Sequence, residues 1–311
     1  KYIGEKWGGK FLRAPDIFFT ILEKGKGKLV RLGDIADVRR GFTTGANEFF
    51  CLSEEAVKHW KIEKDFLRPF VKSPRDLSLI IVQEEELKQW LFYCHKSRHE
   101  LRGSNAIRYI EWGEASERDE SGNEIRCFHE RATCKGRGDW WNLGVRNPAG
   151  VNCNYLVNEV MRFYYGPCFF SDNFQEIHPH EDVDSKILWL VANSSLFQFF
   201  VNMVGRSNFG GGLLKIQTYE VASLILPDPS IIALDMKSSE FFNREIRSIF
   251  EECGLDRKRD IRDQEPHPLP DRKRLDDIVF DAIGLTAAER KEVYWSVCEL
   301  VKNRLDKAGS V

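Results

Sequence analysis

Three glycine-flanked loops hold the side chains of this sequence that are best suited to contact a nucleic acid. They span residues 39–47, 135–141 and 206–215, and the last contains three consecutive glycines. Arginine can bond guanine O6 and N7, asparagine can bond adenine N6 and N7, and threonine can reach a phosphate or a thymine methyl group. The candidate DNA-contact residues of these loops are Arg39, Arg40, Thr43, Thr44, Asn47, Lys135, Arg137, Trp140, Trp141, Arg206, Ser207, Asn208, Gly211 and Lys215.

Each loop also has a purely structural interpretation, because a polar, glycine-rich loop is typical of a surface turn. In RSNFGGGLLKIQ (206–217), bare backbone would let N–H groups approach a phosphate, or it would only permit a tight helix-to-strand reversal. Trp140 and Trp141 have the pattern of exposed aromatics beside the basic side chains Lys135 and Arg137. Three such loops in one chain favour nucleic-acid contact over three unrelated turns.

A zinc site and a nuclease site are the next chemistries to consider. Cys127, His129 and Cys134 offer two thiols and an imidazole, but they lack the paired C-x2–4-C spacing of structural zinc sites. A metal-dependent nuclease needs spaced acids together with a lysine. Asp16, with Glu23 and Lys26, comes nearest, without the tight acid-x-Lys spacing. We therefore expect no metal and no cleavage.

Methyl transfer to adenine needs an Asn/Asp-Pro-Pro-aromatic loop that holds the amino group of a flipped base. The nearest match, at 147–150, reads Asn-Pro-Ala-Gly and lacks the second proline and the aromatic residue. A glycine-rich cofactor loop after a strand is also missing from the sequence. We assign no catalytic residue and no cofactor to this chain.

The composition is that of a globular protein, with 311 residues of which 42% are hydrophobic, 12% aromatic and 30% charged. The net charge of −2 is unevenly distributed: residues 1–50 hold ten basic against six acidic side chains, and 111–124 hold six acidic against one basic. No apolar run approaches the roughly 18 residues that cross a membrane. Eight cysteines without a C-x-x-C pair favour reduced thiols and a cytoplasmic location.

Short strands mixed irregularly with helices predict an α+β fold, with a mixed or antiparallel sheet and packed helices. We expect strands or strand-like segments at 29–38 (a strand or a strand–helix unit), 77–82, 213–219 and 221–226, and a hairpin of 151–165 and 168–174 joined at Gly166-Pro167. We expect helices at 54–60 behind Ser53, 84–91, 96–109, 185–204, 239–253, 275–283 and 287–308, the last begun by a Thr286–Glu289 capping box. An acidic loop is expected at 111–124.

The domain organisation follows from the same pattern. Residues 1–28 are predicted to connect to a missing upstream domain, and 29–230 to form the main domain. Residues 231–311 are predicted to form a helical C-terminal segment with a charged linker at 256–274.

Several blocks follow one another in a familiar order. They are KLVRLGDIADVRRGFTTGANEFFCL (28–52), GRGDWWNL (136–143), FFSDNFQEIHP (169–179), the stretch 190–229 with GRSNFGGGLLKIQ, and LDDIVFDAIGLTAAER (275–290). Across roughly residues 10–305 the chain resembles the C-terminal specificity region of N6-adenine DNA methyltransferases of restriction–modification systems. The first block and the Pro-Asp-Pro ending also resemble the target-recognition domains of type I specificity subunits.

This resemblance implies a target-recognition domain that binds double-stranded DNA and catalyses nothing by itself. It further implies an upstream methyltransferase domain that binds S-adenosylmethionine and methylates a flipped adenine. That domain is an expected partner, and a restriction subunit is a further one. The alternative from the sequence is a protein–protein docking module of a restriction–modification complex, which the acidic loop and the amphipathic last helix would fit.

Overall fold

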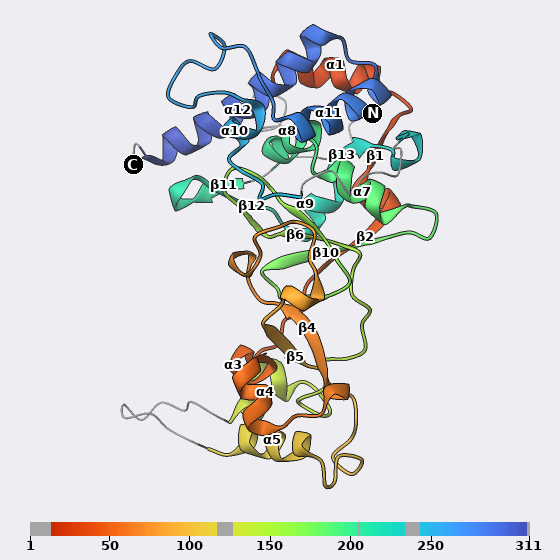
Figure 1. Cartoon of the computed structure of the whole chain (residues 1–311), viewed down its shortest axis with the longest axis vertical. Coiled ribbons are helices and arrows are strands. Elements are labelled where there is room, and N and C mark those ends of the chain that lie inside the picture. The colour runs from red at the N-terminus through yellow and green to blue at the C-terminus, as the bar shows by residue number, and fades with distance from the viewer. Residues whose placement is uncertain (1–13, 117–126, 205, 234–242, 310–311) are drawn as a thin grey trace.

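The computed structural model describes residues 14–116, 127–204, 206–233 and 243–309, with only the backbone described for 206–210. The molecule is elongated and has two lobes (Figure 1). The large lobe surrounds a hydrophobic core built from residues 17–36, 71–87 and 151–301. The small lobe surrounds a second core from 42–70 and 91–141, to which Phe169 also belongs. The fold is α+β, as the sequence predicts.

The central sheet of the large lobe has the strand order β2-β10-β6-β8, with antiparallel neighbours throughout. A two-stranded sheet and a three-stranded sheet, ordered β11-β12-β7, adjoin it. The strands of these sheets are β1 (Leu29–Arg31), β2 (Ala36–Arg40), β6 (Val151–Asn154), β7 (Leu156–Val157), β8 (Phe163–Tyr165), β10 (Phe174–Pro179), β11 (Arg206–Phe209), β12 (Leu213–Lys215) and β13 (Ile225–Pro227).

The helices of the large lobe gather mainly at its end farthest from the small lobe (Figure 1). They are α1 (Asp16–Lys24), α2 (Leu32–Ile35), α7 (Ser185–Ala192), α8 (Ser195–Val204), α9 (Thr218–Ala222), α10 (Ile249–Cys253), α11 (Pro270–Ile283) and α12 (Ala287–Gly309). Of these, α7 and α9 lie nearer the central sheet (Figure 1). A buried polar network joins three of the helices. Arg272 of α11 bonds Glu252 of α10 at 3.0 Å, and the carboxylate of Asp276 accepts from the backbone N–H of Ser195 at 2.7 Å, which caps α8.

The small lobe is built on the sheet β3-β5-β4-β9, in which β9 runs parallel to β4. Its elements are α3 (Asn47–Phe50), β3 (Cys51–Ser53), α4 (Glu54–Trp60), β4 (Leu67–Val71), β5 (Gln89–Phe92), α5 (Asn105–Glu114), α6 (Ala132–Lys135) and β9 (Phe169–Phe170). Aromatic rings fill its core, where Phe49 stacks on Tyr109 with ring centroids 4.5 Å apart. Short 3-10 helices lie at 64–66, 74–76, 84–86, 128–130, 210–212 and 229–231.

Several local predictions are confirmed. The helix at 54–60 forms as expected, and the Ser53 hydroxyl accepts from the Ala56 N–H at 3.2 Å. The 29–38 segment is a strand–helix unit that runs into β2. The Thr286–Glu289 capping box starts α12, with the Glu289 carboxylate accepting from the Thr286 N–H at 2.7 Å. These signals succeed because their hydrogen bonds are local in the chain.

The predictions for the segment between the lobes are wrong. Residues 77–82 form only an isolated bridge at Ile81, and 84–91 is a 3-10 turn followed by β5. The expected hairpin at Gly166-Pro167 does not form, because β8 reverses onto β6 while β9 pairs with β4 of the other core. In each case a partner distant in sequence overrides the local pattern.

The helix predictions need further corrections. The predicted helix 185–204 is two helices bent by 69°, because the side chains at the break bond backbone carbonyls: Asn193 those of Phe163 and Trp189, and Ser194 that of Val191. In the described part, no single helix is long and apolar enough to span a membrane.

Other boundaries shift in the same way. The expected helix 96–109 is α5, which begins after its cap Ser104. Residues 218–222 are helical rather than β, and the helix expected at 239–253 is only α10 within 243–253. Helix α11 begins at Pro270, inside the expected linker. Of the acidic stretch 111–124, residues 111–114 end α5, and 117–126 lie outside the described residues.

Candidate nucleic-acid interface

The first loop leaves the central sheet at its β2 edge, where Arg39 and Arg40 lie on opposite faces of the strand. Arg39 is exposed and pairs with Asp37 on its own face, with Nη2 and Oδ2 3.0 Å apart. The Arg40 Nε donates to the backbone carbonyl of Asp172 at 3.1 Å. The two neighbouring arginines therefore cannot serve the same surface, and only Arg40 turns toward the third loop.

Arg40, Tyr155, Lys215 and Gln217 form a group that we call the Tyr155 cluster. The guanidinium carbon of Arg40 lies 4.5 Å from the centroid of the Tyr155 ring, and Lys215 Nζ lies 5.2 Å from it. The Gln217 side chain donates to the Tyr155 hydroxyl at 3.2 Å. The cluster joins the first and third loops, which the sequence separates by more than 150 positions.

The charges of the cluster change the pKa of the Tyr155 hydroxyl. Burial alone would raise the pKa of Tyr155. Hydrogen bonding by Lys215 and Gln217, the positive charge of Lys215 and hydrogen bonding by Arg40 together outweigh burial. The pKa of Tyr155 therefore lies below its usual value. The sequence analysis did not identify Tyr155. The residues around it in the sequence give no sign that Arg40 and Lys215 lie over its ring.

Arg146 is a second residue that sequence reasoning missed. Its exposed guanidinium lies 4.8 Å from the centroid of the Phe42 ring, and Nη1 donates to the Arg40 carbonyl at 3.4 Å. It adds a third cation close to the end of β2.

Gly41 fixes the path of the first loop against residues 170–172. A Cβ at Gly41 would lie 2.2 Å from the Ser171 carbonyl oxygen, so only glycine permits this approach. The Phe42 N–H donates to the Phe170 carbonyl at 2.8 Å. Thr43 remains exposed beyond this contact, and its hydroxyl lies 3.4 Å from the Asp172 carboxylate.

The second half of the first loop is held from inside. Thr44 is buried, and its hydroxyl donates to the side-chain oxygen of Asn47 while accepting from the Ala46 N–H. Arg137 of the second loop donates to the carbonyls of Thr43 and Thr44 at 3.1 Å and 2.8 Å. Thr44 and Arg137 therefore support the loop. Burial removes the Thr44 side chain from the expected DNA contacts, whereas Arg137 is half-buried.

The expectation of exposed aromatics in the second loop is wrong. Trp140 and Trp141 are 6% and 3% exposed and belong to the core of the small lobe. Their indole N–H groups are satisfied inside, by Glu114 Oε1 at 2.8 Å and by the Lys96 carbonyl at 3.2 Å. Large rings stabilise a core far more than they stabilise a surface loop, so burial prevails. Lys135 stays exposed and pairs with Glu130 at 2.7 Å, which raises the pKa of Lys135.

The third loop packs on the C-terminal helix. Gly212 has a φ of +70°, and a Cβ there would lie 3.1 Å from Leu305 and 3.3 Å from Ala308 of α12. Arg304 of α12 donates to the carbonyls of Gly212 and Asn158. The glycine run thus permits a close approach to a helix, whereas Gly211, at φ +74°, faces open space. The side chains of Arg206, Ser207 and Asn208 lie outside the described residues.

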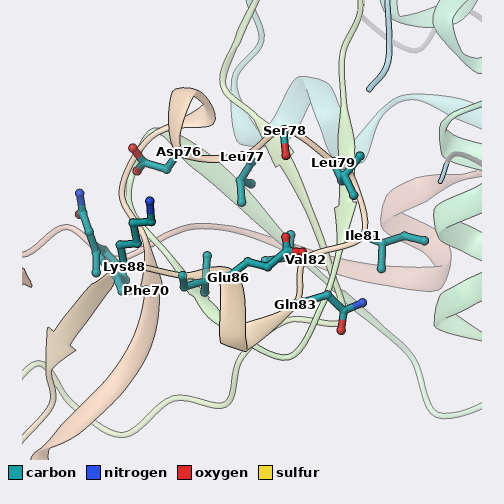
Figure 2. A pocket seen from close by; sticks show the side chains of 12 residues that line it. Phe70, Asp76, Leu77, Ser78, Leu79, Ile81, Val82, Gln83, Glu86 and Lys88 are labelled. Carbon is teal, nitrogen blue, oxygen red and sulfur yellow. The ribbon is translucent and has the colours of Figure 1, made fainter. Parts of the chain in front are cut away.

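A cavity of about 400 Å³ lies elsewhere, in the segment between β4 and β5 (Figure 2). Its lining mixes apolar side chains such as Phe70, Leu77 and Val82 with Glu86 and Lys88. None of the candidate DNA-contact residues lines it.

The cysteine and histidine candidates have structural partners. The Cys134 thiol donates to the Thr44 carbonyl and the Cys127 thiol to the Glu114 carbonyl, while His129 lies 3.4 Å from Glu130. Among the described residues, no group of three or more His, Cys, Asp or Glu side chains is placed to bind a metal ion.

The comparison with protein families identifies this architecture. The model of the family "Type II methyltransferase M.Eco57I, C-terminal domain" matches residues 4–264. The chain belongs to this family. The resemblance to the C-terminal region of restriction–modification methyltransferases is therefore confirmed.

Two curated relatives of this family member are bacterial methyltransferases. Type II methyltransferase M.AccI of Acinetobacter calcoaceticus is 24% identical over 263 residues, which cover 79% of the chain and 43% of the relative. Type II methyltransferase M.XamI of Xanthomonas campestris pv. amaranthicola is 23% identical over 215 residues, 64% of the chain and 36% of the relative. The chain thus spans less than half the length of either relative.

A solved structure shares the fold of this M.Eco57I-type domain. The type IIG restriction endonuclease BpuSI matches with a TM-score of 0.62 at 12% identity, over 94% of the chain and 34% of that protein. At this level of identity the match establishes the fold alone.

Proposed function

We propose that the chain is the double-stranded DNA recognition domain of an adenine-specific DNA methyltransferase of a restriction–modification system. Membership of the M.Eco57I C-terminal domain family supports this proposal. The observation that carries it is the gathering of Arg40, Arg146 and Lys215 where the first and third loops meet, beside the half-buried ring of Tyr155. Cations grouped around an accessible edge of a sheet suit the phosphates of a duplex.

The division of labour in the longer protein is part of the same proposal. The chain contributes binding and no chemistry, since its only approach to an adenine-methylation loop is Asn147-Pro148-Ala149-Gly150. S-adenosylmethionine and the flipped adenine belong to an upstream domain, which is the first protein partner that we propose. A restriction subunit is a second one. We further propose that the DNA recognition domain spans residues 29–230, between the connector 1–28 and the helical segment 231–311.

An electrophoretic shift of the isolated chain on random-sequence duplexes tests the proposal. We expect a shift at low salt that disappears steeply as salt rises, because each phosphate contact releases counterions. Absence of a shift at low salt would favour the rival function, a docking module for a methyltransferase or nuclease subunit. Enrichment of one sequence from the bound pool would separate sequence reading from unspecific binding.

The adenine specificity of the longer protein needs its own assay. We expect that DNA methylated by that protein yields N6-methyladenine on nucleoside analysis. Recovery of methylated cytosine alone would remove the adenine assignment and leave the DNA-binding role untouched.

A further inference from the structure

The Tyr155 cluster presents hydrogen-bond donors around one hydroxyl. Gln217 donates to the phenol oxygen at 3.2 Å, and the cationic groups of Arg40 and Lys215 lie 4.5 Å and 5.2 Å from the centroid of the ring. A tyrosine hydroxyl accepts through its lone pairs and has one proton to donate. In the described part of the chain, no oxygen accepts the proton of Tyr155.

The positions of these groups are fixed by the sheet. The Tyr155 N–H donates to the Asn173 carbonyl at 3.0 Å, and the Tyr155 carbonyl accepts from the Ile216 N–H at 3.4 Å. The buried Gln175 side chain donates to the Ile216 carbonyl at 2.6 Å. Arg40 Nε donates to the Asp172 carbonyl, and this bond holds the guanidinium over the Tyr155 ring. The sheet therefore holds the two cations and the Gln217 side chain in place around the Tyr155 ring and its hydroxyl.

We propose that Arg40, Tyr155 and Lys215 together bind one backbone phosphate of duplex DNA, with the hydroxyl donating to a phosphate oxygen and the two cations neutralising its charge. The proposal rests on the proposed function and assigns a specific contact within it.

The two positive charges beside one hydroxyl are the reason to prefer a phosphate over a base edge. A base edge in the major groove is uncharged and presents at most two acceptors. Guanine presents two acceptors in one plane, which suits a single bidentate arginine. Three donors from three strands or strand ends suit the tetrahedral oxygens of a phosphate. Such a contact positions the duplex without reading its sequence.

The test measures the affinity of the chain for two random-sequence duplexes, one rich in A·T and one rich in G·C, across a salt series. We expect Arg40→Ala and Lys215→Ala each to weaken binding by about five- to tenfold at 0.1 M salt and to lower the slope of log K against log salt by about one. Tyr155→Phe removes a neutral hydrogen bond, so it should weaken binding by about three- to tenfold with an unchanged slope. Each factor should be the same on both duplexes.

Arg102→Ala is the matched control, because Arg102 is exposed on the small lobe and has no ion pair within the described residues. It should bind DNA like the wild type, and all affinities are compared at a temperature where each variant is fully folded. Wild-type affinity and slope in Arg40→Ala and Lys215→Ala would overturn the phosphate site while the proposed function stands. Losses confined to one duplex would replace it with a base contact. A wild-type chain that binds neither duplex would overturn both proposals.

Discussion

The Tyr155 cluster and the 135–141 loop contain the same ingredients, cations beside aromatic rings, and use them in opposite ways. In the Tyr155 cluster, two cations flank a half-buried ring whose hydroxyl proton has no acceptor in the described part of the chain. In the 135–141 loop, both tryptophans are buried, and Arg137 donates to three backbone carbonyls. The comparison shows that composition alone identifies a polar loop. Burial and hydrogen bonding decide whether the side chains of that loop are free to contact a ligand or instead support a neighbouring loop.

The largest expected effect lies in the supporting loop. Trp140→Ala should lower the free energy of unfolding of the small lobe by about 3–5 kcal/mol, because it empties a core position and removes the indole bond to Glu114. Denaturant unfolding followed by circular dichroism measures it. A loss below about 1 kcal/mol would contradict the supporting role.

Arg137→Ala should have the next largest effect on stability. Its guanidinium bonds the carbonyls of Thr43, Thr44 and Trp140, and charged hydrogen bonds of this kind contribute about 1.5–3 kcal/mol. The same unfolding assay applies. Any loss of DNA affinity should follow the loss of folded protein, so Arg137→Ala at a temperature where it is fully folded should bind within about twofold of wild type. Strong loss of binding by a fully folded variant would move Arg137 into the contact surface.

Arg304→Ala should affect both properties moderately. Arg304 ties the glycine turn to α12, and the turn leads into β12, which carries Lys215. We expect about 1–3 kcal/mol less stability, from the loss of its hydrogen bonds to Gly212, Asn158 and Asn202.

The effect of Arg304→Ala on DNA affinity shows whether Arg304 positions the loop or contacts the DNA itself. Affinity should fall severalfold, with an unchanged salt slope, because no phosphate contact is lost. A slope reduced by about one would show that Arg304 itself contacts a phosphate.

The smallest effect is expected at Arg39, which lies beside Arg40 but on the opposite face of β2 and already pairs with Asp37. Arg39→Ala should change stability by less than about 0.5 kcal/mol and DNA affinity by less than about twofold. Fluorescence anisotropy with a labelled duplex compares it with Arg40→Ala. Equal losses of DNA affinity in the two variants would mean that both faces of β2 contact the DNA.

The sequence predicts the parts of this molecule whose causes are local. Ser53 and the Thr286–Glu289 pair cap their helices through bonds three residues apart. The helix expected at 84–91 fails because β5 is fixed by β3 and β4 on either side. The broken helix at Asn193 depends on the carbonyl of Phe163, thirty residues away.

The candidate site divides in the same manner. Arg40 and Lys215 are foreseeable from their loops. Tyr155 is not, since its role exists only once β2, the connection between β6 and β7, and β12 bring positions 40, 155 and 215 together. The burial of Trp140 and Trp141 is likewise hidden, because their loop is polar in sequence and the core that receives them comes from 42–70 and 91–114.

The most direct measurement of the central claim is the salt dependence of duplex binding by the double variant Arg40→Ala/Lys215→Ala beside the wild-type chain. If the Tyr155 cluster holds the DNA backbone, the wild type binds at low salt, and the double variant binds more weakly on every duplex with a slope of log K against log salt lower by about two. Parallel salt plots with equal affinities would contradict the account.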